Sequence, residues 1–183
     1  LPVSFPQHVG QVPLFYNHKP SGGRTHWQGD YVEMTTKALY PFGHGLSYTT
    51  FDYADLHITP QEVHANSIVD VSFTLTNTGQ RAGDEVVQLY VCDPIASVTR
   101  PVSALKGFKR IRLQPGERRI VTFALDVRHL AFYDRAMRYQ VEPGTIVVRV
   151  GSSSQDIRLT GHFEIIGVST EVDQVFFTGV TVK

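Results

Sequence analysis

The feature that most limits the possible folds is a series of short apolar runs, each bounded by Gly, Pro, Asn or Asp, that begins near residue 51. In the run from Val69 to Leu75, apolar side chains alternate with Asp, Ser and Thr. Because successive side chains of a strand point to opposite faces, this alternation buries one face and exposes the other. Such runs at this spacing are typical of an all-β sandwich.

The runs predict seven strands, a number that matches an immunoglobulin-like or fibronectin III-like antiparallel β-sandwich. The run from Val86 to Val91 is apolar on both faces, which indicates a central strand covered on two sides. A tight hairpin is expected at 132–141. The predicted strands lie near 51–60, 68–76, 84–93, 104–113, 117–126, 145–151 and 156–165.

The first 50 residues have a different character. Eleven of them are Pro or Gly, against 14 of the other 133 residues, and they hold eight of the twenty aromatic residues. They show neither a two-residue nor a 3.6-residue apolar period, so we expect an irregular, loop-rich segment. A long irregular segment is usually functional or packed on another element. We therefore expect that the surface that covers its aromatic rings lies outside this chain.

Composition excludes several classes of function. The chain has 17 Lys and Arg against 17 Asp and Glu, so there is no basic excess to neutralise a nucleic-acid backbone. The apolar runs are far shorter than the roughly 18 residues that a membrane-spanning helix needs. Cys92 is the single cysteine, which excludes an intramolecular disulfide and leaves the compartment open. The start at Leu1, without Met or a signal segment, indicates a piece of a longer polypeptide.

Several motifs in order along the chain resemble the fibronectin type III-like domain that closes many family-3 glycoside hydrolases. Upstream of them, the stretch 39–51 (LYPFGHGLSYTTF) looks like the junction in those enzymes between an α/β sandwich domain and the terminal β domain. The motifs are NTG at 77–79, GDEVVQLYV at 83–91, LKGF at 105–108, LQPGE at 113–117, YD at 133–134 and EPG at 142–144.

The resemblance also divides the chain. Residues 1–50 are similar to the C-terminal segment and linker of the α/β sandwich domain, and residues 51–166 correspond to the fibronectin III-like β-sandwich. Residues 167–183 fall outside the resemblance and are expected to form a C-terminal tail.

The resemblance implies a parent with an N-terminal (β/α)8 barrel that bears an Asp nucleophile and an α/β sandwich that supplies the Glu acid/base. Neither segment is present, so we expect no catalytic residue, no cofactor and no metal site, and an inactive isolated chain. The chain would be a non-catalytic accessory domain of a retaining β-glycosidase that acts on terminal β-linked glucose or xylose. Its partners would be the parent's catalytic domains and, through them, an oligosaccharide, with no nucleic acid and no membrane. A secreted or periplasmic parent is favoured.

Carboxylates were considered as a glycosidase pair, because retaining enzymes place two carboxyl groups about 5–5.5 Å apart. Asp84 and Glu85 are neighbours on a predicted strand and are expected to point to opposite faces. The other acidic pairs lie beside turns or edges and are interpreted as solvated or turn-capping: Asp30 and Glu33, Asp52 and Asp55, and Asp126 and Asp134. The spacing of His18, His26 and His44 follows no metal-ligand pattern.

Three residues of the N-terminal segment are candidates for substrate binding at the rim of the parent's pocket: Lys19, Arg24 and Trp27. An indole face stacks on a sugar ring, and the two cations donate hydrogen bonds to hydroxyl groups. The alternative is that this loop docks on the missing domain. Independent alternatives for the whole chain are a carbohydrate-binding or adhesion module, with a platform made by Tyr90, Phe108, Tyr133 and Tyr139, and a structural spacer.

Overall fold

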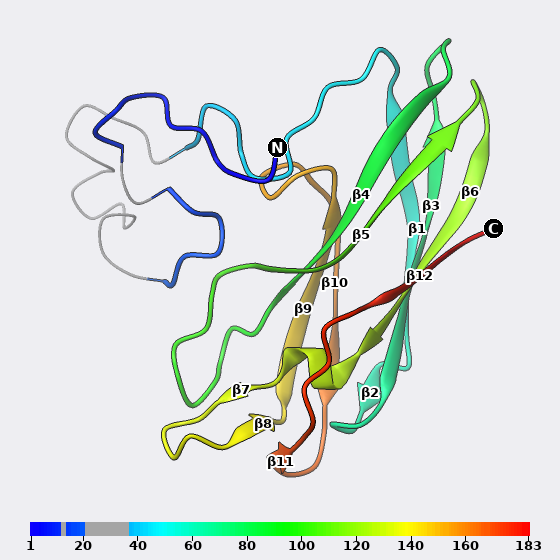
Figure 1. Ribbon diagram of the computed structural model, residues 1–183. Helices are drawn as coiled ribbons and strands as arrows, with labels where there is room; N and C mark the ends of the chain where they lie inside the picture. Colours follow the sequence, from blue (N-terminus) through cyan, green and yellow to red (C-terminus); the bar gives the residue numbers. More distant parts are fainter. Residues whose placement is uncertain (12–13, 21–36) are drawn as a thin grey trace.

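The computed structural model describes residues 1–11, 14–20 and 37–183. It is an all-β sandwich preceded by a loop-rich N-terminal segment, so the predicted fold class is confirmed (Figure 1). The elements in chain order are β1 (Phe51–Thr59), β2 (Glu62–Val63), β3 (Ile68–Asn77), β4 (Gly83–Cys92), β5 (Ala104–Leu113), β6 (Arg118–Asp126), the 3-10 helix η1 (Val127–Leu130), β7 (Phe132–Tyr133), β8 (Tyr139–Val141), β9 (Gly144–Gly151), β10 (Ile157–Ile165), β11 (Thr170–Glu171) and β12 (Gly179–Val182).

In the described residues, the strands form two main sheets and one small sheet. The order is β1-β3-β6-β12 in one main sheet and β2-β10-β9-β4-β5 in the other. The small sheet, β11-β8-β7, lies at the end of the sandwich away from the N-terminal segment (Figure 1). The seven predicted strands are β1, β3, β4, β5, β6, β9 and β10, and the predicted hairpin is the antiparallel pair of β7 and β8.

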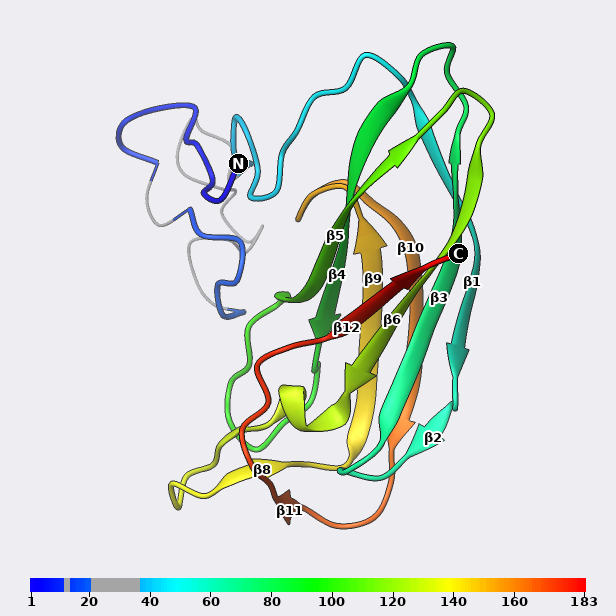
Figure 2. The ribbon, with the colours of Figure 1, turned by 45° about the vertical axis from the view of Figure 1, so that its right-hand side comes forward.

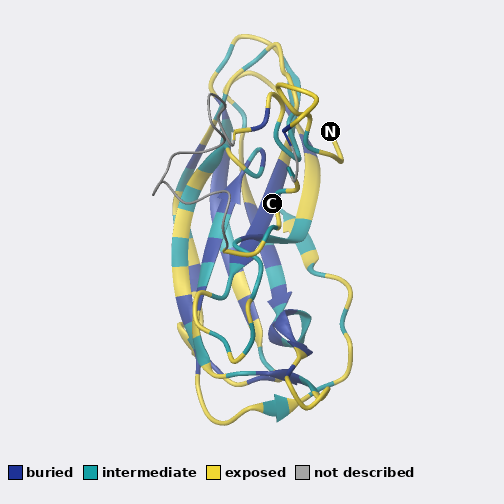
Figure 3. Cartoon of the chain, turned by 90° about the vertical axis from the view of Figure 1, so that its left-hand side faces the viewer, coloured by how far each residue is buried: buried dark blue, intermediate teal, exposed yellow. Residues whose placement is uncertain are grey.

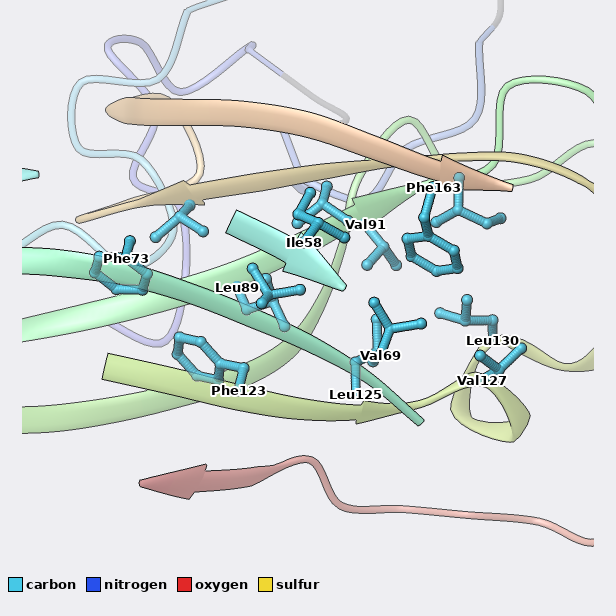
Figure 4. Packing of buried hydrophobic residues seen from close by; sticks show 14 of the residues in the cluster. Ile58, Val69, Phe73, Leu89, Val91, Phe123, Leu125, Val127, Leu130 and Phe163 are labelled. Atoms are coloured by element: carbon cyan, nitrogen blue, oxygen red, sulfur yellow. The ribbon is translucent and has the colours of Figure 1, made fainter. Parts of the chain in front are cut away.

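The hydrophobic core lies between the two main sheets (Figure 4). The apolar residues of β3 that alternation assigned to the core are buried there, because their side chains all leave the same face of the strand. The aromatic rings of Tyr53, Phe73 and Phe123 are stacked in sequence, with centroid separations of 5.6 and 6.3 Å. This ring stack joins β1, β3 and β6 from within the core.

Strand β4 is central, as its apolar pattern predicted, since it pairs with β5 on one side and with β9 on the other. Val87 and Leu89 face the core, and Tyr90 is buried on the opposite face. Pairing with β9 begins only at Gln88, which lies opposite Gly151. Val86, just before this point, is 38% exposed, and the first half of β4 borders an open space.

The last residues of the chain also take part in the sandwich. The sequence pattern left 167–183 outside the predicted strands, whereas the structure forms β11 and β12 there. β12 pairs antiparallel with β6 and also contacts β5, as it crosses the molecule in Figure 2. At Gly107 of β5 an added Cβ would lie 2.9 Å from a ring carbon of Phe123 and 3.3 Å from the Cβ of Thr178. The absence of a side chain at this position lets the C-terminal segment approach the core.

The described part of the N-terminal segment is held to the sandwich by aromatic contacts. The ring of Tyr16 stacks on Phe42 at 4.2 Å and meets the ring of Tyr90 edge-on at 5.8 Å. Many other apolar side chains of this segment are exposed, and Figure 3 shows the segment as mostly exposed beside buried strands. These exposed residues are Leu1, Val3, Phe5, Val9, Phe15, Leu39, Tyr40, Leu46 and Tyr48, and we call them the N-terminal apolar surface.

Candidate functional site

A hollow lies where the N-terminal segment meets the sandwich, and we call it the junction cleft. It has a volume of ≈ 660 Å³, within the usual range of ligand-binding pockets. Its walls are the linker (residues 41–50), the first residues of β1, the first half of β4, and the residues around the turn that precedes β10. Its ionisable side chains are His44, Tyr53, Asp84, Glu85, Asp156 and Arg158.

Gln88 holds one end of the linker against β4. Its buried amide group donates hydrogen bonds to the backbone oxygens of Gly43, at 3.2 Å, and Ser152. The Tyr90 hydroxyl donates to Gln88 Oε1 at 2.5 Å. An added Cβ at Gly43 would lie 2.1 Å from Gln88 Oε1, and the φ of Gly43 is +83°, a conformation that L-residues rarely adopt. Glycine is therefore required at this position.

We expect that Gly43→Ala weakens the attachment of the linker and lowers the free energy of unfolding by more than about 1 kcal/mol, because both the backbone conformation and the contact with Gln88 are lost. Limited proteolysis of the linker and urea denaturation measure the two effects. Gly45→Ala is the matched control, since an added Cβ at Gly45 meets no atom within 4 Å. Equal behaviour of the two variants would contradict this account of the linker.

Asn77, at the end of β3, holds the other end of the linker. The Thr49 hydroxyl donates to Asn77 Oδ1 at 2.7 Å, and the backbone N–H of Gly79 donates to the same oxygen at 3.1 Å. Asn77 Nδ2 donates to the backbone oxygens of Arg81, at 2.8 Å, and Leu113, at 3.1 Å. Sequence reasoning identified Asn77 only as part of the motif at 77–79, because nothing in Asn-Thr-Gly shows that this amide group is fully buried.

Glu85 is the half-buried carboxyl group of the junction cleft. Its Oε1 accepts a hydrogen bond from the Tyr53 hydroxyl at 2.9 Å. Burial raises the pKa of Glu85 above its ordinary value, although the Tyr53 hydrogen bond and the charge of Arg158 act in the opposite direction. Burial, followed by the charge of Glu85, also raises the pKa of Tyr53, so Tyr53 keeps its proton and remains a donor.

Asp84 borders the same cleft as Glu85 but has different hydrogen-bond partners, and the expected opposite orientation of the two side chains stays a prediction. It accepts a hydrogen bond from Arg110 at 2.6 Å, and this bond lowers the pKa of Asp84. Each of the two carboxyl groups thus has its own hydrogen-bond donor, Arg110 for Asp84 and Tyr53 for Glu85.

Of the other acidic residues that were weighed as catalytic, three have structural partners in the described part of the chain: Asp55, Asp126 and Asp134. Asp126 accepts the backbone N–H of Arg128 at 2.9 Å and caps η1. Asp134 accepts the backbone N–H groups of Ala136, at 2.8 Å, and Arg138, at 2.9 Å. These contacts agree with the turn-capping interpretation of both residues. Asp55 is paired with Arg118 at 2.7 Å. Asp30 and Glu33 lie outside the described residues.

The predicted substrate-binding residues are not brought into the junction cleft by the part of the chain that is described. Lys19 is exposed, whereas Arg24 and Trp27 lie outside the described residues, so their role stays a prediction. His26 lies outside as well, and the residues that are described contain no cluster of three metal-ligating side chains. No described helix is long and apolar enough to cross a membrane.

The four aromatic residues considered as a carbohydrate platform do not share one surface. Tyr90 is buried beneath Tyr16, and Phe108 is 64% exposed on β5. Tyr133 and Tyr139 contact each other on the β7–β8 hairpin, with ring centroids 5.1 Å apart.

A second group of charged and titratable side chains is partly buried around β5 and η1. The Lys106 ammonium donates to the backbone oxygen of His129 at 2.6 Å, and burial lowers the pKa of Lys106 to about 8. Burial, together with the Lys106 charge, lowers the pKa of His129 to about 4. The Arg100 guanidinium lies 4.1 Å over the Phe132 ring. The hollow between Arg100 and Lys106 measures only ≈ 20 Å³, room for about one water molecule, so this group supports the fold.

Comparison with known proteins assigns a domain type to the sandwich. Residues 85–154 match the fibronectin type III-like domain. The chain is 40% identical over 172 residues to the periplasmic β-glucosidase of Salmonella typhimurium, and the match covers 91% of this chain and 22% of that protein. It is 45% identical over 159 residues to a β-xylosidase of Formosa agariphila, with 85% of this chain and 21% of that protein covered.

A solved structure has a similar fold. The β-glucosidase from Listeria innocua in complex with glucose superimposes with a TM-score of 0.83 at 36% identity, and the match covers 92% of this chain and 24% of that chain. The chain thus spans about a fifth of the length of the curated relatives that it matches. These findings confirm the resemblance drawn from the motifs.

Proposed function

Because this chain carries a fibronectin type III-like domain and corresponds to part of larger β-glucosidases and β-xylosidases, we propose that it is the C-terminal accessory domain of a longer retaining β-glycosidase. The proposed parent acts on terminal β-linked glucose or xylose. In this proposal residues 1–50 complete the preceding α/β domain and residues 51–166 form the accessory sandwich. The observation that carries the proposal is the match of nearly the whole chain to about a fifth of these enzymes.

The N-terminal apolar surface supports this role. Leu46 is 92% exposed and Tyr48 is 94% exposed, and they belong to a segment that connects directly to the sandwich. Exposed apolar side chains that gather on one segment favour an interface, since burying them removes apolar surface from water. The rest of the longer enzyme would cover this surface and so be stabilised by the contact, while Gln88 and Asn77 hold the linker in a defined position.

The segment that contains Lys19, Arg24 and Trp27 would contribute to the rim of the parent's substrate pocket. Its connection to the sandwich supports this placement, because the backbone oxygen of His18 accepts the N–H of Val102 at 2.9 Å and the Tyr16 hydroxyl accepts the N–H of Leu105 at 3.3 Å. These contacts anchor the start of the segment close to β5.

The proposal predicts that the isolated chain does not hydrolyse aryl β-glucosides or aryl β-xylosides, because it places the nucleophile and the acid/base in other parts of the longer enzyme. Chromogenic assays of the purified chain measure this directly, with the longer gene product as the positive control. Turnover by the purified chain at a constant specific activity through successive columns would contradict a non-catalytic role. An inactive longer product would contradict the proposed parent.

A further inference from the structure

We propose that the junction cleft is a socket for a basic side chain, Lys or Arg, from another part of the same longer polypeptide, with Glu85 as its counter-ion. This inference rests on the proposed function, since it assigns the partner that the accessory domain contacts. It adds a specific charge pair to an interface that is otherwise apolar.

The first argument is that Glu85 lacks a cationic partner in the described part of the chain. Its one hydrogen bond there is the contact of Oε1 with the neutral Tyr53 hydroxyl, and no ion pair includes Glu85. Arg158 is nearby, but its guanidinium donates to both oxygens of Asp156, at 2.6 and 2.9 Å. Arg110 is likewise engaged by Asp84, and the Leu1 ammonium at the cleft donates to the backbone oxygen of His44 at 2.7 Å.

The second argument is energetic. A half-buried carboxylate is destabilised by the loss of water unless a cation or several donors replace it. The raised pKa of Glu85 has this cause, with burial as the largest contribution. Asp84 and Asp156 add negative charge to the same cleft, and the pKa of each is lowered by its own arginine. The remaining ionisable side chain, His44, packs its ring on Tyr40 at 5.0 Å. An incoming cation would offset the desolvation cost of the charged Glu85 carboxylate.

The third argument is the shape of the walls. Lys and Arg carry an aliphatic stem that packs on apolar surface while the charged head reaches a polar site. The cleft offers both, because Phe108, Leu46 and Val86 are exposed at its walls and Glu85 lies inside. Leu46 is also part of the N-terminal apolar surface, so the cleft continues the surface proposed to contact the catalytic part. The relatives contain about four-fifths of additional length from which this side chain could come.

The test is Glu85→Gln, measured in the isolated chain and in the longer gene product. The glutamine amide oxygen can accept the Tyr53 hydrogen bond, and the variant removes only the charge. In the isolated chain we expect the denaturation midpoint at pH 7 to be unchanged or higher, because a half-buried charge without a partner has been removed. In the longer product we expect the same substitution to lower the Tm by at least about 3 °C and to speed cleavage of the linker by protease.

The pH dependence provides a second measurement on the isolated chain. A carboxyl group with a raised pKa holds its proton in the folded state at pH values where the unfolded chain has lost it. Its contribution to stability is therefore complete below the ordinary pKa of 4.5 and is lost as the pH rises through the folded value. Glu85→Gln should abolish this loss of stability with rising pH. An isolated chain that is instead destabilised by Glu85→Gln at neutral pH would overturn the proposal, because Glu85 would then already have its stabilising partners.

Glu62→Gln is the control variant, since Glu62 is exposed on β2 at the opposite end of the sandwich. If both variants leave the longer product equally stable while it still hydrolyses aryl β-glycosides, the socket is refuted and the proposed function stands. If the longer product is not a glycosidase, the proposed function fails. If Glu85→Gln abolishes association between isolated chains in sedimentation experiments, a second copy is the occupant, and the proposal is overturned.

Discussion

Phe123→Ala is expected to lower the free energy of unfolding by about 3–5 kcal/mol, the usual cost of removing a buried aromatic side chain. Phe123 is fully buried, its ring continues the stack of Tyr53 and Phe73, and its edge lies against Gly107. The substitution would leave a cavity where β3, β5 and β6 approach one another. Because natural domains are stable by only about 5–15 kcal/mol, this loss is a large fraction of the total. Urea denaturation followed by circular dichroism measures it.

Phe177→Ala is the matched control for this experiment, because Phe177 is 85% exposed in the segment that leads to β12. Its removal from the isolated chain should change stability by no more than about 0.5 kcal/mol, as is usual for surface positions. If Phe177→Ala lowers the free energy of unfolding as much as Phe123→Ala does, this account is contradicted, because an exposed Phe177 makes no core contact to lose.

Asn77→Ala is expected to cost about 2–4 kcal/mol, since each buried polar group left without a partner costs about 1–3 kcal/mol. The Asn77 side chain is fully buried and satisfies groups from the linker, the turn after β3 and the end of β5. The substitution leaves the backbone oxygen of Leu113 in a buried position without this donor. Denaturation measures the stability, and limited proteolysis at residues 41–50 measures release of the linker.

Asn66→Ala is the corresponding control, because Asn66 is exposed in the turn before β3. We expect a stability close to that of the unchanged chain and no faster cleavage of the linker. If Asn77→Ala lowers stability without faster cleavage, Thr49 does not need Asn77 to position the linker, and Gln88 alone holds it.

Much of the fold could be predicted from alternation and turn residues. The core residues of β3 and β6 follow a two-residue period, and the turns beside them carry the Gly, Pro and Asn that short connections need. β12 was not predicted, because its four residues are too few to show a period and because they become a strand by pairing with β6. The division into domains remains a prediction.

The candidate site was less predictable than the fold. Asp84 and Glu85 have the same kind of side chain and adjacent positions, yet an arginine lowers the pKa of one and burial raises the pKa of the other. Gln88 was part of a recognised motif, but its bonds to Gly43 and Ser152 join positions 45 and 64 residues away. Contacts between such distant positions leave no periodic signal in a single sequence.

The sequence by itself determined the fold class, seven strands of the two main sheets and the resemblance to the terminal region of family-3 glycosidases, because all three depend on local pattern or on motifs in order. Only the tertiary structure decided that β4 extends beyond β9, that Asn77 and Gln88 hold the linker and that a half-buried Glu85 borders the junction cleft. The reason is physical: burial and charge pairing depend on which residues the fold brings together, and the relevant residues come from β1, β4, β10 and the linker.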